Sequence, residues 1–90
     1  SESSNIINSI DIYPNPATNF TTLKISSEKT QAITISIVDL LGKEIDEKEV
    51  MIFSGINTEK IDVSEYQNGI YFVNLQIGAQ VTTKKLVITN

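Results

Sequence analysis

The sequence contains no cysteine and no histidine, and these two absences exclude several classes of function. Without cysteine the chain can form neither a disulfide framework nor a thiolate metal site. Without histidine it lacks the side chain that most often serves as a general base and metal ligand near neutral pH. The common Ser–His–Asp hydrolase triads are therefore excluded, and catalysis would have to rest on carboxylates, hydroxyls and lysine.

Arginine is absent too, and the seven lysines are spread along a chain whose eleven acidic residues give a net charge of −4. This composition offers no basic stripe for phosphate groups, so we expect no nucleic-acid partner. The longest apolar runs, Val50 to Phe53 and Ile70 to Val73, have four residues each. A membrane-spanning helix needs about 20, so we expect no membrane insertion. We also expect no cofactor and no metal ion, since no D-x-D-x-D-G calcium loop is present.

Isoleucine, valine and threonine are what the sequence has in abundance, and together they make up a third of it. Their restricted χ1 suits a pleated sheet better than a helix. Between Ala32 and Leu41, three isoleucines alternate with polar residues, which predicts a half-buried antiparallel strand. Thr21, Leu23 and Ile25 alternate with polar neighbours in the same way. These patterns predict an all-β protein.

Two later segments extend this pattern. Gly69 to Ile77 is apolar on both faces in its first half, which predicts a strand in the interior of a sheet. Thr82 to Ile88 carries Leu86 and Ile88 on one face, which predicts a last strand near the end of the chain. Turn signals built on glycine, asparagine and proline separate the strands at the spacing typical of a sandwich or barrel.

The segment Lys43 to Met51 is ambiguous, because it is rich in good helix formers. Val50 and Ile52 nevertheless alternate with Glu49 and Met51, so we favour a strand, with charge along a sheet edge that discourages pairing with a second molecule. Residues 1–9 begin with small polar residues and are interpreted as a linker or an expression remnant. Residues 10–90 are then a single domain.

About seven short strands predict an immunoglobulin-like antiparallel β-sandwich with Greek-key connections. Tyr71 supports this fold, because such domains place a tyrosine two positions before an inward residue of the sixth strand, and Val73 stands at that inward position. An ordinary packed aromatic remains the alternative interpretation of Tyr71.

The sequence also leaves two other kinds of functional site as alternatives, a catalytic carboxylate pair and a sugar-binding platform. Asp39, Asp46, Glu47 and Glu49 form the densest acidic group, and a carboxylate pair could serve glycoside hydrolysis, although solvated acids on an edge strand are the simpler interpretation. The tyrosines Tyr13, Tyr66 and Tyr71 could form a platform that stacks on sugars if they shared a face. Separated this far in sequence, they are more typical of core and corner residues.

The order of four motifs carries a resemblance to a known family. They are Ile12-Tyr13-Pro14-Asn15-Pro16-Ala17-Thr18-Asn19, Val38-Asp39-Leu40-Leu41-Gly42-Lys43, Asn68-Gly69-Ile70-Tyr71-Phe72-Val73 and Thr83-Lys84-Lys85-Leu86-Val87. From about Ile10 to Ile88 the chain resembles the C-terminal sorting domain of the type IX secretion system of Bacteroidetes. The resemblance implies an immunoglobulin-like sandwich that directs an N-terminally attached cargo protein through the outer-membrane translocon and performs no reaction itself.

The resemblance also implies partners, a location and residue roles. Exported cargo would pass through the periplasm, a sortase would remove the domain, and the cargo would reach the cell surface or the extracellular space. A cleavage position is expected in or before residues 1–10. Pro14 to Pro16 would lead rigidly into the first strand, Asp39 and Gly42 would end a strand and form its hairpin turn, and Gly69 with Tyr71 would form the corner. The expected recognition residues are Tyr13, Pro14, Asn15, Pro16, Asp39, Gly42, Gly69, Tyr71, Lys84, Lys85, Leu86 and Val87.

Lys84 to Ile88 matches the stretch on which export depends in this family. Our hypothesis is that Lys84 and Lys85 place charge on both faces of an edge strand whose exposed main chain pairs with a receptor strand. The chain ends in Thr89-Asn90, whereas many family members end in lysine or arginine. The competing hypothesis is an accessory sandwich that binds polysaccharide or mediates adhesion. The oligomeric state is left open.

Overall fold

The computed structural model describes residues 7–90, and every regular element in that range is a β-strand. The strands are β1 (Ile7–Tyr13), β2 (Phe20–Ser27), β3 (Gln31–Asp39), β4 (Glu44–Ile52), β5 (Gly55–Asp62), β6 (Gly69–Ile77) and β7 (Gln80–Ile88). Within residues 7–90 there is accordingly no helix with the length and hydropathy that crossing a membrane requires.

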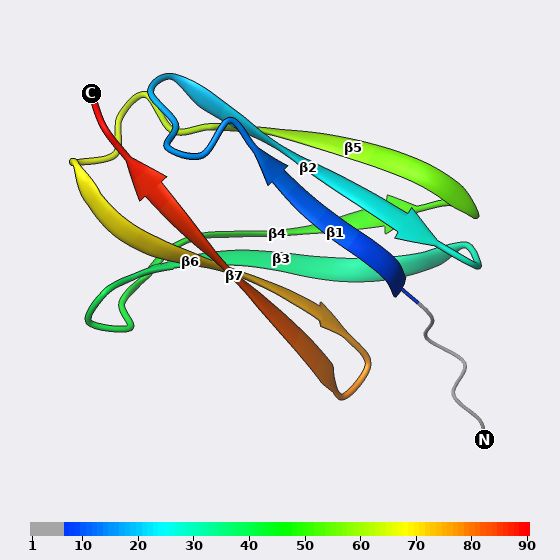
Figure 1. The fold of residues 1–90 in the computed structure, drawn as a ribbon. Helices are drawn as coiled ribbons and strands as arrows, with labels where there is room; N and C mark the ends of the chain where they lie inside the picture. The colour runs from blue at the N-terminus through cyan, green and yellow to red at the C-terminus, as the bar shows by residue number, and fades with distance from the viewer. Residues whose placement is uncertain (1–6) are drawn as a thin grey trace.

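The strands form two antiparallel sheets that pack as two layers (Figure 1). One sheet has the order β1-β2-β5 and the other the order β4-β3-β6-β7. The chain changes sheet between β2 and β3, between β4 and β5, and between β5 and β6, which gives the Greek-key connectivity of an immunoglobulin-like sandwich. The fold class predicted from the sequence is confirmed.

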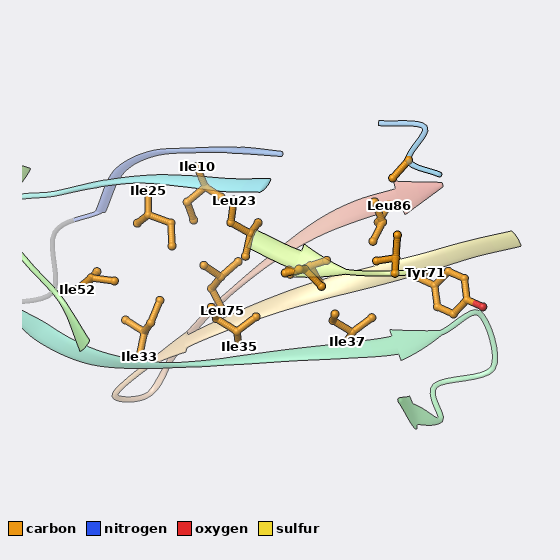
Figure 2. Packing of buried hydrophobic residues seen from close by; sticks show 14 of the residues in the cluster. Ile10, Leu23, Ile25, Ile33, Ile35, Ile37, Ile52, Tyr71, Leu75 and Leu86 are labelled. Atoms are coloured by element: carbon orange, nitrogen blue, oxygen red, sulfur yellow. The ribbon is translucent and has the colours of Figure 1, made fainter. Parts of the chain in front are cut away.

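The core lies between the layers and is built from the alternate residues that each strand turns inward (Figure 2). Ile33, Ile35 and Ile37 of β3 are each at most 2% exposed, as their two-residue period predicted. In β6 the buried face begins at Tyr71 and continues with alternate residues to Ile77. β6 lies between β3 and β7, so its predicted position in the interior of a sheet is also confirmed.

β4 settles the ambiguity of the segment rich in helix formers. It pairs with β3 alone, from Ile52 opposite Gln31 to Glu44 opposite Val38, and is an edge strand of its sheet. Its residues from Glu44 to Glu49 are exposed, and only Ile52 is fully buried. The ladder with β3 outweighs helix propensity here, because a weak local preference yields to tertiary pairing.

The start of the chain differs from expectation. β1 begins at Ile7, so residues 7–9 belong to the sheet and not to a linker, whereas residues 1–6, with part of the expected cleavage region, lie outside the described residues. A register shift lies between Ile7 and Ser9, and from there Ile10 and Ile12 alternate with the exposed Asp11. Pro14 to Pro16 consequently connect β1 to β2 instead of leading into the first strand.

Candidate recognition site

The four motifs are far apart in the sequence, yet they meet at one end of the sandwich. In Figure 1 the connection from β1 to β2, the hairpin between β3 and β4, the start of β6 and the C-terminus all lie at that end. Two hydrogen bonds join the Asn15 side chain to residues of β7 that lie 70 and 72 positions later in the sequence. We call this region the motif end.

The connection from β1 to β2 closes the outer edge of β7. The Asn15 side chain donates from Nδ2 to the Lys85 carbonyl oxygen (2.8 Å) and accepts at Oδ1 from the Val87 amide (3.0 Å). The Ala17 amide donates to the Val87 carbonyl oxygen (2.8 Å), and the Thr89 amide donates to that of Ala17 (2.9 Å). Ala17 and Ile88 thus form a short parallel bridge, and Ala17 is fully buried.

These hydrogen bonds correct the hypothesis that a receptor strand pairs with the main chain along Lys84 to Ile88. β7 is an edge strand, as expected. The outward backbone groups of Val87, with the Lys85 carbonyl and the Thr89 amide, are already bonded to Asn15 and Ala17. On β7 itself, the backbone edge that stays open to a further strand lies in the first half, around Val81 and Thr83.

The hairpin between β3 and β4 is held by Asp39, the last residue of β3. Its Oδ1 accepts from the amides of Leu41 and Lys43, both at 2.9 Å, and its carbonyl oxygen accepts from the Gly42 amide at 3.0 Å. Gly42 has a φ of +89°, a conformation that residues with a Cβ rarely adopt. The turn presents Leu40 and Leu41 at its tip, 63% and 93% exposed.

The corner that precedes β6 is built around Tyr71. Its hydroxyl donates to the Gln67 carbonyl oxygen at 2.7 Å, which is the contact of a tyrosine corner, and its ring closes this end of the core (Figure 2). Gly69, where β6 begins, has a φ of +149°. The end of the chain is attached to the same corner, since the Asn90 amide donates to Asn68 Oδ1 at 2.7 Å and Asn90 Nδ2 donates to the Tyr66 carbonyl oxygen at 2.9 Å.

Tyr66 supports the corner by packing against Tyr71, with ring centroids 5.3 Å apart and planes tilted by 47°. Its hydroxyl is buried and has no hydrogen-bond partner within residues 7–90. Burial, with a smaller effect of the Asp46 carboxylate, raises the pKa of Tyr66 to about 12. Both influences disfavour the phenolate.

Lys84 and Lys85 lie on opposite faces of β7. Lys84 follows the inward alternation of Leu86 and Ile88 and is half-buried. It lines a hollow of about 200 Å³ with residues 7–10 of β1. Lys85 is exposed on the outer face, opposite Phe72 of β6. The two lysines therefore face different surroundings, although they are adjacent in sequence.

The acidic residues do not form a convincing catalytic pair. Asp39 is bound in the hairpin turn, and Glu47 and Glu49 are exposed on β4. Asp46 lines a pocket of about 280 Å³ together with Asp62, two lysines and isoleucines of the core. Hydrogen bonds from the Ser64 hydroxyl and amide lower the pKa of Asp62, whereas a general acid needs a raised one. Within residues 7–90, no three acidic side chains are grouped as a metal ion requires.

The three tyrosines do not form a sugar-stacking platform. Tyr71 is only 7% exposed and belongs to the core, whereas Tyr13, at the end of β1, is 47% exposed. The ring of Tyr71 therefore has no open face for a sugar.

The recognition residues expected from the sequence did not include several residues that build the motif end. They are Ala17, Thr18, Tyr66, Asn68 and Asn90. Ala17 directly follows Pro16 in the first motif. A small side chain beside two prolines was the local signal that could have identified it as a packed residue. The remaining contacts join segments far apart in the chain and leave no local pattern.

Comparison with known proteins supplies a family. A family model described as "Secretion system C-terminal sorting domain" matches residues 11–89. Among solved structures, the chain is similar to dimeric latent PorU from Porphyromonas gingivalis, with a TM-score of 0.76 and 16% identity over 98% of this chain. That match shows the shared fold, and the chain spans only 10% of the PorU chain.

A second structure, a β-D-glucoside glucohydrolase from Trichoderma reesei, is similar to 96% of this chain and 19% of its own, at 10% identity. Its TM-score of 0.48 is too low to support an argument. No curated protein sequence matches the chain.

Proposed function

The chain belongs to the family of secretion system C-terminal sorting domains, and we propose that it directs an N-terminally attached cargo protein through the type IX outer-membrane translocon. The resemblance seen in its motifs is confirmed by a family match that covers residues 11–89. The family is defined by a sorting signal and not by a reaction, so the domain acts by being recognised.

The observation that carries the proposal is the meeting of all four motifs at the motif end. Asn15 and Ala17 hold the last residues of β7, Asn90 contacts the corner residues Asn68 and Tyr66, and Tyr71 anchors that corner in the core. A receptor that contacts this end would read residues from every motif at once. The signal is therefore a surface of the folded domain and not a linear peptide.

The proposal extends to the route of the cargo. The cargo would cross the inner membrane by the general secretory route and pass through the periplasm with the sorting domain folded. After translocation, a sortase would remove the domain upstream of β1 and the cargo would be attached at the cell surface. The start of β1 lies at the end of the sandwich opposite the C-terminus (Figure 1). The first described residue of the domain is therefore remote from the motif end.

Deleting residues 84–90 is a poor test of this function. Leu86 and Ile88 are at most 1% exposed in the core, and removing each large buried aliphatic side chain costs about 2–5 kcal/mol. Such a deletion would unfold the domain, and lost export would then say nothing about recognition.

A sharper test fuses residues 1–90 to a periplasmic fluorescent reporter in a host with an active type IX system. We expect the reporter outside the cell only when both the domain and a functional translocon are present. The matched controls are the same reporter without the domain and the same fusion in a translocon-deficient host. A folded fusion that stays in the periplasm of the competent host would contradict the proposed function.

A further inference from the structure

An apolar patch lies on the outer face of the four-stranded sheet at the motif end. We define it as Val38 of β3, Ile70 and Phe72 of β6, and Val87 of β7. Val38 is directly opposite Phe72, and Ile70 is directly opposite Val87. Directly opposed residues have Cβ atoms about 4.5–5.5 Å apart, so the four side chains form one continuous surface.

The patch faces away from the core. Its residues alternate with Ile37, Tyr71, Val73, Leu86 and Ile88, which are buried between the sheets. All four patch residues are only half-buried, because no third layer of residues 7–90 covers this side of the sandwich. Next to the patch the same face is polar along β6 and β7, where Thr83 donates a hydrogen bond to Asn74 Oδ1 at 2.7 Å. The four patch residues are thus a contiguous apolar group at the motif end, whereas Val81, which is also exposed on this face, lies outside the group.

The apolar surface continues beyond the patch. Ile70 lines a surface hollow together with Leu40 and Leu41 of the hairpin tip, and both leucines are exposed. Contiguous exposed apolar surface on a small domain commonly marks a site of interaction with another macromolecule.

Lys85 gives this surface a charge. It is directly opposite Phe72 on the outer face and has no ion-pair partner within residues 7–90. Its positive charge stands out on a chain with a net charge of −4. A partner with a carboxylate beside an apolar surface would match both features.

Because the backbone edge at the end of β7 is already bonded, a receptor can recognise this region only through its side chains. Asn15 and Ala17 occupy the outward backbone groups of Val87 and the Lys85 carbonyl, so a receptor strand cannot pair there without displacing them. The outer-face side chains of Lys85 and Val87 remain accessible.

We propose that the patch, together with Lys85, is the docking surface for a protein receptor of the translocon that presents an apolar surface bearing a carboxylate. This inference rests on the proposed function and names the surface that performs it. Binding buries the patch, and the Lys85 ammonium pairs with the receptor carboxylate and sets the register of the complex.

The test uses the reporter fusion with two variants and two matched controls. Phe72→Thr removes apolar surface but keeps a residue suited to a strand, and Lys85→Glu reverses the charge. Val81→Thr is the control for the first, because Val81 is an exposed residue on the same face of β7 outside the patch. Lys29→Glu is the control for the second, because Lys29 is exposed in the connection between β2 and β3 and belongs to none of the four motifs. Urea unfolding of each purified domain shows whether it still folds.

We expect Phe72→Thr and Lys85→Glu to lower export at least tenfold with folding retained, while Val81→Thr, Lys29→Glu and the charge-conserving Lys85→Arg export normally. Normal export of folded Phe72→Thr and Lys85→Glu variants would overturn the inference but leave the proposed function intact, since the unsubstituted fusion reports on that separately. A dimer of the isolated domain that Phe72→Thr dissociates would assign the patch to a second copy of the chain and would also overturn it.

Discussion

The side-chain amide of Asn15 bonds to the backbone of β7 in the way a neighbouring strand would, donating to the Lys85 carbonyl oxygen and accepting from the Val87 amide. One side chain thereby satisfies two outward groups of an edge strand. Edge strands with unpaired backbone groups invite pairing with other chains, and here the closure comes from the chain itself. Asn15 thus stabilises the last strand and limits how a partner can approach it.

Replacing Asn15 by alanine should loosen the end of β7. The Val87 amide and the Lys85 carbonyl would lose their partners, so we expect unfolding free energy to fall by about 1–2 kcal/mol in urea titrations. Hydrogen exchange of the Val87 amide should accelerate. Asn74→Ala is the control, because among residues 7–90 the Asn74 side chain bonds only that of Thr83, so Val87 exchange should not change. Equal Val87 protection in the Asn15→Ala variant and the parent domain would contradict this role.

The two corner tyrosines should respond in opposite ways to loss of the hydroxyl. Tyr71→Phe removes the bond to the Gln67 carbonyl oxygen and should lower the free energy of unfolding by about 1 kcal/mol. Tyr66→Phe removes a buried hydroxyl without a partner in the described part of the chain, so stability near neutral pH should stay equal or increase. Thermal or urea unfolding compares the pair directly, and a larger loss from Tyr66→Phe than from Tyr71→Phe would refute this assignment.

Stability should decline in alkaline solution because of Tyr66. Its pKa is about 12 in the folded chain and about 10 in the unfolded chain, so the unfolded state ionises first. The stabilisation from the neutral phenol is complete below about pH 10 and is lost as the pH rises from about 10 towards about 12. Urea midpoints measured across this window should fall more steeply for the parent domain than for Tyr66→Phe. Parallel curves for the two proteins would show that Tyr66 is not responsible.

Gly42→Ala should destabilise the hairpin through the backbone alone. A Cβ at Gly42 would meet no atom within 4 Å, but the φ of +89° costs an alanine about 1–2 kcal/mol. Gly42→Asn should cost less, since asparagine tolerates positive φ better. Urea unfolding of the two variants gives the comparison. An alanine variant as stable as the parent domain would mean that the turn adopts another conformation.

Much of the fold was readable from local sequence pattern. The period of two in β3, β6 and β7 predicted which side chains are buried, because successive residues of any strand point to opposite faces. Tyr71 could be placed at a corner from its spacing to Val73. The motif residues themselves, from Tyr13 to Val87, were also identified in the sequence, although their role in recognition remains a prediction.

Tertiary structure alone decided which of these residues meet and which faces remain open. Asn15 reaches β7 across 72 residues, and no local pattern encodes a hydrogen bond between segments so far apart. The sequence likewise predicted an apolar outer side for the first half of β6, but only the number of layers determines whether that side is covered. Two sheets bury one face of each strand, so Ile70 and Phe72 are left at the surface, where another protein can contact them.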